Sequence, residues 1–172
     1  MDERLAHRAE VPVCRLPDGR LDLEAFRAAA LRLIGQGASC LTVCGTYASY
    51  RPVDLQEQER LLTAALKAAE GRVPVAMGAL DAGTEKAADR VREHAALGCH
   101  LHICAPSFYF SMSHEDELLR HFAALHAADP KGRLILLEDR SCRGDRFPEG
   151  PRQRLLAEPW VAAILSGREA DA

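Results

Sequence analysis

The sequence predicts an α/β fold with a parallel sheet, and three observations support this prediction. Short apolar segments alternate with longer amphipathic segments along the chain. The apolar segments are continuous, as expected for strands that are covered on both faces. One strand and one helix together take about thirty residues, a spacing typical of parallel α/β proteins. The 172 residues are enough for a hydrophobic core, and we predict one domain over residues 1–172.

The strands are expected where apolar runs are bounded by turn residues. In chain order they lie at residues 9–14, 39–45, 72–79, 99–106, 132–139 and 160–166. The first run, "AEVPVC", is short and is followed by the turn sequence "LPDGR". The other runs are each preceded by a helix pattern, so six βα-type units are predicted.

The helices are expected where apolar residues recur at helical spacing between these strands. In chain order they lie at residues 22–37, 54–71, 83–98, 113–129 and 150–158. Asp22 and Asp54 are the expected N-caps of the first two helices, and Glu57 completes a capping box with Asp54. Thr84 is expected to cap the third helix, and Pro151 lies in the first turn of the last one.

Composition excludes several classes of partner. The net charge is −3, which predicts no basic surface for nucleic acid or for an anionic membrane. No apolar run is long enough to cross a bilayer. The sequence begins with the charged stretch "MDERLAHRAEVPV", which does not resemble a secretory signal. We therefore expect a cytoplasmic protein with no nucleic-acid or membrane partner.

The cysteines predict reduced thiols and no metal site. They are Cys14, Cys40, Cys44, Cys99, Cys104 and Cys142. No two of them form the closely spaced C-x-x-C pair that a zinc site requires. Several lie in apolar runs, where cysteine acts as a small hydrophobic residue. No cofactor is predicted either.

The histidines gather in the second half of the sequence. His100 and His102 share one face of a predicted strand with Cys104, because side chains alternate along a strand. A metal site is one interpretation of this face, and hydrogen-bonded histidines against helices or a barrel interior are the favoured one. His121 and His126 lie with His114 on one predicted helix, where a solvated face is expected.

Polar residues follow two of the predicted strands where an α/β protein places its ligands. Gly45, Thr46 and Tyr47 follow the second strand, and Glu138 ends the fifth. The carboxyl ends of parallel strands meet at one edge, so we expect these residues to share a concave mouth with Tyr109. An anion is expected near Thr46, on the assumption that the backbone donors there are free.

The order of several segments resembles the dihydrodipicolinate synthase / N-acetylneuraminate lyase family, whose members are Schiff-base (β/α)8 lyases and aldolases. The resemblance runs from about Val11 to about Gly167. The stretch "CGTYAS" falls where the family has Gly-Thr-Thr-Gly-Glu, and "APSFYF" is similar to its Pro-Pro-Tyr-Tyr segment. The stretch "EPWVAAILSG" occupies the place of the strand that carries the Schiff-base lysine.

The same resemblance implies that the groups that do the covalent chemistry are replaced. Leu165 falls on the Schiff-base lysine, and Leu137 falls on the tyrosine that ends the fifth strand. The arginine that binds the substrate carboxylate falls on Cys142, with Arg143 beside it. A leucine cannot form an imine, so the lyase reaction of the family is not expected.

The candidate site combines three retained positions, Gly45, Thr46 and Tyr109, with Tyr47 and Arg143 beside them. Gly45, Thr46, Tyr47, Tyr109 and Arg143 are the expected ligand-binding residues, for a small keto-acid-like anion. No catalytic residue is assigned.

Glu138 and Tyr47 are the two candidates if a catalytic site has been rebuilt.

Two questions of architecture and function stay open at this stage. A complete barrel needs about 250 residues, so the chain predicts a truncated, partial barrel of six βα units, or alternatively an open doubly wound sheet. Because the edge of such a partial barrel is unpaired, we expect a homo-oligomer or a partner chain. The function is then either that of a small-molecule-binding or interaction protein, or that of an enzyme with a rebuilt site or one completed by a partner chain.

Overall fold

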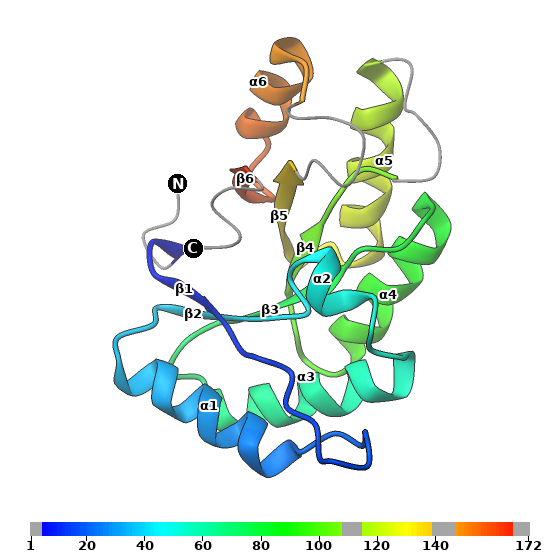
Figure 1. The fold of residues 1–172 in the computed structure, drawn as a ribbon. Helices are drawn as coiled ribbons and strands as arrows, with labels where there is room; N and C mark the ends of the chain where they lie inside the picture. The colour runs from blue at the N-terminus through cyan, green and yellow to red at the C-terminus, as the bar shows by residue number, and fades with distance from the viewer. Residues whose placement is uncertain (1–4, 108–114, 139–146, 167–172) are drawn as a thin grey trace. The chain divides into compact units, whose positions relative to one another are not determined.

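The computed structural model describes residues 5–107, 115–138 and 147–166. The chain divides into two compact units, and each is described by itself. The N-terminal unit runs from Asp2 to Gly78, and the C-terminal unit runs from Ala79 to Ala172. Strands and helices alternate in both units, as Figure 1 shows. The predicted α/β class with parallel strands is confirmed.

The N-terminal unit contains the first three strands and three helices. In chain order its elements are β1 (Arg8–Glu10), α1 (Leu23–Gly35), β2 (Cys40–Val43), α2 (Tyr47–Tyr50), α3 (Leu55–Ala69) and β3 (Val75–Ala79), the last of which ends at the unit boundary. Strand β2 pairs in parallel with β1 on one side and with β3 on the other. Helices α1 and α3 lie side by side against these strands (Figure 1).

The local sequence explains where the helices of this unit begin. The Asp22 side chain accepts a hydrogen bond from the N–H of Ala25 and caps α1. Asp54 and Glu57 form the predicted capping box of α3, each side chain accepting the backbone N–H of the other residue. These contacts use N–H groups that the first turn of a helix leaves unpaired. Both predicted N-caps are therefore confirmed.

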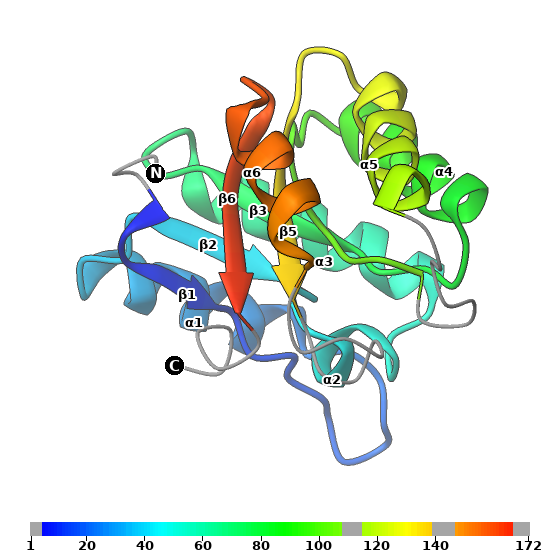
Figure 2. The ribbon, with the colours of Figure 1, turned by 90° about the horizontal axis from the view of Figure 1, so that it is seen from above.

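The C-terminal unit also alternates helices with parallel strands. Its elements are α4 (Thr84–Ala96), β4 (Leu101–Cys104), α5 (Glu115–Ala128), β5 (Arg133–Glu138), α6 (Glu149–Ala157) and β6 (Val161–Ser166). Strand β5 pairs in parallel with both β4 and β6. Figure 2 shows β5 and β6 next to each other. Leu134 and Leu136 of β5 pack with Phe122 of α5 and Leu155 of α6 in one apolar cluster.

The connectivity within each unit separates the two predicted architectures. The strand order is sequential, β1-β2-β3 in one unit and β4-β5-β6 in the other. In the C-terminal unit, α4, α5 and α6 all contribute to the apolar cluster on one face of the strands. A doubly wound sheet places helices on both faces and reverses its strand order at a switch point. The structure therefore has the connectivity of a (β/α) barrel and not that of a doubly wound sheet.

Two local features differ from the sequence-based expectation. Thr84 does not cap α4, because Gly83 is the N-cap and makes no side-chain bond there. The Thr84 hydroxyl instead lies 2.8 Å from Nδ1 of His121. Helix α2 was not predicted, because its four residues are too few to show a helical period. No helix among the residues that the structure describes is long and apolar enough to cross a membrane.

Candidate functional site

The two leucines that the family resemblance aligns with the Schiff-base lysine and its tyrosine are neighbours on β5 and β6. Leu137 and Leu165 are partners in the register of this parallel pair. Side chains of paired residues point to the same side of a sheet, so the two lie together. Leu137 has no exposed surface, and Leu165 is 6% exposed. The resemblance therefore assigns the lysine and the tyrosine to adjacent positions, and this chain fills both with buried hydrocarbon.

Glu138 does not lie on the side of Leu137. Successive side chains of a strand alternate, so Glu138 shares the helix-facing side with Leu136. Its carboxylate is buried and accepts a hydrogen bond from the backbone N–H of Phe147 at 3.0 Å. The Nε of Arg152, from α6, lies 3.4 Å from the same oxygen. The Glu138 carboxylate thus connects the end of β5 to α6 and to Phe147, and the expectation that Glu138 faces a mouth at the strand ends stays a prediction.

None of the three lysines of the sequence lies on a strand. Lys67 is on α3, Lys86 is on α4, and Lys131 lies in the turn before β5. That turn is at the amino end of the strand, whereas barrel enzymes place their chemistry at the carboxyl end. The three lysines thus lie on two helices and in a turn before a strand.

Gly45, Thr46 and Tyr47 follow β2, as predicted, but their backbone donors are occupied. Thr46 is the N-cap of α2 and forms a capping box with Ser49. The N–H of Thr46 donates to the Ser49 hydroxyl at 3.2 Å. The N–H of Gly45 donates to the carboxylate of Glu10 at 3.0 Å. The assumption that these donors are free for an anion is wrong, because side chains of the same unit already satisfy them.

The remaining predicted site residues are placed as follows. Tyr47 is buried, and the guanidinium carbon of Arg51 lies 5.2 Å from the centre of its ring. Tyr109, Cys142 and Arg143 fall outside the described residues. Glu138 belongs to the C-terminal unit and Tyr47 to the N-terminal unit, so a mouth shared by them stays a prediction.

Glu10 is the polar residue at the strand ends that sequence reasoning missed. It ends β1 and pairs in register with Thr42 of β2. One carboxylate oxygen accepts the Thr42 hydroxyl at 2.5 Å, and the other accepts the N–H of Gly45. The signal was present in the sequence, because an acidic residue inside the apolar run "AEVPVC" requires a partner if its side chain is buried.

The C-terminal unit contains a second polar cluster, made of histidines and one aspartate. Nδ1 of His100 lies 2.8 Å and Nε2 of His102 lies 2.9 Å from the same oxygen of Asp129. His102 is fully buried, and its ring stacks on His94 with centroids 5.9 Å apart. The favoured interpretation, hydrogen-bonded histidines on this strand face, is confirmed. No group of three potential ligands suited to a metal ion occurs among the described residues.

The histidines of α5 do not form a solvated face, contrary to the prediction. His121 is 2% exposed, and Nε2 lies 3.1 Å from the carbonyl oxygen of Ala105. Burial lowers the pKa of His121 to about 4, and the bond to the Ala105 carbonyl partly offsets this effect. The His126 ring stacks on Trp160 at a centroid distance of 5.0 Å. These partners lie on other elements, so the helical pattern could not show them.

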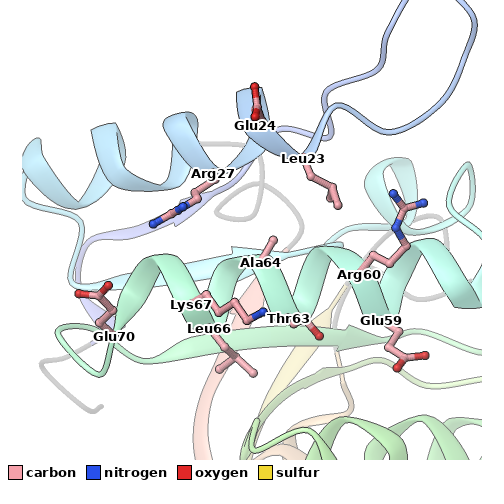
Figure 3. A pocket seen from close by; sticks show the side chains of 10 residues that line it. All are labelled: Leu23, Glu24, Arg27, Glu59, Arg60, Thr63, Ala64, Leu66, Lys67 and Glu70. Atoms are coloured by element: carbon pink, nitrogen blue, oxygen red, sulfur yellow. The ribbon is translucent and has the colours of Figure 1, made fainter.

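A groove of about 930 Å³ lies between α1 and α3 on the N-terminal unit, and Figure 3 shows its lining. Leu23 and Ala64 face each other across it, and Arg27 and Arg60 extend into the space between the helices. Its lining residues are Leu23, Glu24, Arg27, Glu59, Arg60, Thr63, Ala64, Leu66, Lys67 and Glu70. Basic and acidic residues are balanced, so the groove shows no preference for ligand charge.

The fold is that of a partial parallel (β/α) barrel. The family model of the dihydrodipicolinate synthetase family matches residues 10–138. The chain belongs to this family.

Individual relatives agree with this assignment. The 4-hydroxy-tetrahydrodipicolinate synthase of Hyphomonas neptunium is 32% identical over 111 residues, which are 64% of this chain and 38% of that protein. The synthase of Xanthomonas axonopodis pv. citri is 31% identical over 154 residues, which are 88% of this chain and 50% of that protein. The chain thus spans half or less of the length of the curated relatives it matches.

Solved structures confirm the fold. The dihydrodipicolinate synthase of Agrobacterium tumefaciens has a TM-score of 0.80 at 23% identity, over 95% of this chain and 55% of that one. A catalytic lysine mutant of the sialic acid aldolase of Ruminococcus gnavus has a TM-score of 0.81 at 16% identity, over 95% of this chain and 54% of that one. The predicted partial-barrel fold is therefore confirmed.

Proposed function

We propose that this chain carries out no Schiff-base reaction of its own and acts as a small-molecule-binding or interaction protein of the dihydrodipicolinate synthetase family. The pairing of Leu137 with Leu165 on β5 and β6 carries this proposal. Imine formation needs a primary amine, and the following proton transfers need a hydroxyl or another acid–base group. Two buried leucines supply neither.

The other candidate groups do not replace them. The Glu138 carboxylate is held by the N–H of Phe147 and by Arg152 on the side of the helices. Lys67, Lys86 and Lys131 are on helices or in a turn. A rebuilt enzyme, or a site completed by a partner chain, is the alternative, and it would have to supply its amine from outside the strands of this chain.

Trapping with borohydride tests the proposal. The purified protein is incubated with pyruvate, reduced, and measured by intact mass. We expect no adduct, whereas a stoichiometric adduct that maps to Lys67, Lys86 or Lys131 would contradict the proposal.

Leu165→Lys is the matched positive control for position 165. A lysine placed among buried apolar groups has a lowered pKa and is more readily an amine nucleophile. We expect a pyruvate adduct in this variant alone, mapped by digestion to the peptide that contains position 165. If the folded variant gives none, position 165 is not the Schiff-base position, and the register assignment is wrong.

We also propose that the protein assembles with itself or with a partner. Among the described residues, β1 pairs with β2 alone and β6 pairs with β5 alone. An unpaired parallel edge exposes backbone N–H and C=O groups that favour association. Light scattering should show a dimer or larger species, and a monomer at high micromolar concentration would contradict this. The cytoplasmic location expected from composition belongs to the same proposal, and cell fractionation tests it.

A further inference from the structure

The Glu10 carboxylate is bound as a ligand carboxylate would be. Its two oxygens accept from two different donors, the hydroxyl of Thr42 and the backbone N–H of Gly45. Both donors are at the carboxyl end of β2, where parallel α/β proteins bind their ligands. A hydroxyl and a backbone N–H that converge on one carboxylate are also the donors by which proteins recognise small acids.

The backbone holds Glu10 in this position. Glu10 and Thr42 are register partners, and the N–H of Val11 donates to the carbonyl of Thr42 at 2.9 Å. The residue that carries the carboxylate is thus fixed by the backbone hydrogen bond of its neighbour Val11 to β2. A tethered group has a far higher effective concentration than a dissolved ligand, so it occupies the donors continuously.

The same contact disfavours a second anion. A ligand carboxylate would have to displace Glu10 from the Gly45 N–H and then lie beside its negative charge. Like charges brought together in a partly buried place repel each other, which reduces the affinity for acids in particular. A neutral molecule of the same shape does not meet this repulsion.

We propose that Glu10 is a built-in carboxylate that occupies the anion-binding position at the end of β2, so that the N-terminal unit rejects small carboxylic acids. This inference goes beyond the proposed function, because it concerns non-covalent selection of ligands and holds whether or not an imine forms elsewhere.

The test is a titration of wild type, Glu10→Ala and Glu10→Gln with pyruvate, followed by NMR at the backbone amide of Gly45. Pyruvamide, which has the same shape without the charge, is the neutral probe. For Glu10→Ala we expect a saturable shift with at least about tenfold tighter pyruvate binding than wild type. Glu10→Gln keeps an acceptor for the N–H without the charge, so a smaller gain is expected.

Glu24→Ala is the matched control, because it removes an exposed carboxylate from α1 of the same unit. It should bind pyruvate as weakly as wild type. The proposal is overturned if wild type shifts the Gly45 amide with pyruvate as strongly as Glu10→Ala does. It is also overturned if no folded Glu10 variant gains affinity, or if pyruvamide gains as much as pyruvate. Where Glu10→Ala does not fold, Glu10→Gln decides alone.

Borohydride trapping distinguishes a failure of this inference from a failure of the proposed function. None of the Glu10 variants gains a lysine, so their pyruvate binding should leave no reduced adduct. An adduct in wild type would refute the proposed function without affecting the role of Glu10. Absence of anion binding in the variants would refute the role of Glu10 without affecting the proposed function.

Discussion

The two units of the molecule satisfy their buried polar groups in different ways. In the N-terminal unit, a carboxylate meets a hydroxyl and a backbone N–H at the end of β2. In the C-terminal unit, three of the six buried polar residues that the structure describes are histidines, and six of the seven histidines of the sequence lie in this unit. A histidine ring titrates near neutral pH, whereas a hydroxyl and an N–H do not. The comparison teaches that the C-terminal unit depends on the neutral form of its buried histidines, whereas no histidine takes part in the contacts at the end of β2.

The buried histidines of the C-terminal unit stay neutral because burial disfavours their charged form. Burial lowers the pKa of His94 to about 3, helped by the nearby His102 ring and by Arg90. Burial also lowers the pKa of His102, against the opposing effect of Asp129. Burial acts to raise the pKa of the Asp129 carboxyl, but the hydrogen bonds to His102 and His100 and the electrostatic effect of both rings together outweigh it, so the pKa is lowered.

Acid should therefore weaken the C-terminal unit, and this is the largest effect we expect. A histidine whose folded pKa is depressed favours folding while it is neutral, and the unfolded chain binds the proton first as the pH falls below 6.5. For His121, whose folded pKa is about 4, the loss is about 3 kcal/mol by pH 4. Hydrogen exchange between pH 7 and pH 4, corrected for intrinsic rates, should show lost protection in the C-terminal unit. Equal loss in both units would remove the distinction between them.

The second prediction probes the N-terminal unit at Gly78 of β3. A Cβ there would overlap the carbonyl oxygen of Cys44, which has a positive φ of 49°. Gly78→Ala should cost about 3 kcal/mol, because the obstacle is backbone and cannot rotate away. Gly35→Ala in α1 is the control, since nothing lies near its Cβ position. Urea unfolding measures both, and an equal effect of the two changes would contradict the close packing.

The third prediction removes the acceptor of the histidine cluster. Asp129→Ala leaves Nε2 of the fully buried His102 without its acceptor, so unfolding should become easier by about 2 kcal/mol. His100→Ala is the matched control, because its side chain is 48% exposed and water replaces the bond. Thermal unfolding at pH 7 compares them. If both variants lose the same stability, the buried bond between Asp129 and His102 contributes no more to stability than the exposed bond between Asp129 and His100.

The smallest effect is expected at Thr46. Thr46→Val removes the hydroxyl that caps α2, at a cost of about 1 kcal/mol. Thr46→Ser keeps a hydroxyl and should keep the stability. Hydrogen exchange at the amide of Ser49 reports on this cap directly. A valine variant with wild-type exchange would show that the capping box does not stabilise the turn.

The sequence by itself determined the local features of this protein. Asp22, Asp54 and Glu57 cap helices as predicted, because a cap is a contact between residues three positions apart. The strands follow from continuous apolar runs, and the parallel α/β class follows from their regular alternation with helices. The alignment of Leu137 and Leu165 with the family's tyrosine and lysine also comes from sequence, through the order of the family's segments, and it stays a prediction.

Only the tertiary structure decided which polar groups meet. Glu10 and Gly45 are far apart in sequence, and their contact exists because β1 and β2 pair in register. His121 is buried through partners on other elements, and Glu138 likewise contacts Arg152 of α6. Helical and strand periods show which residues share a face, but they carry no information on what covers that face. Long-range pairing supplies that information, and it changed an expected anion site into one that the chain's own carboxylate occupies.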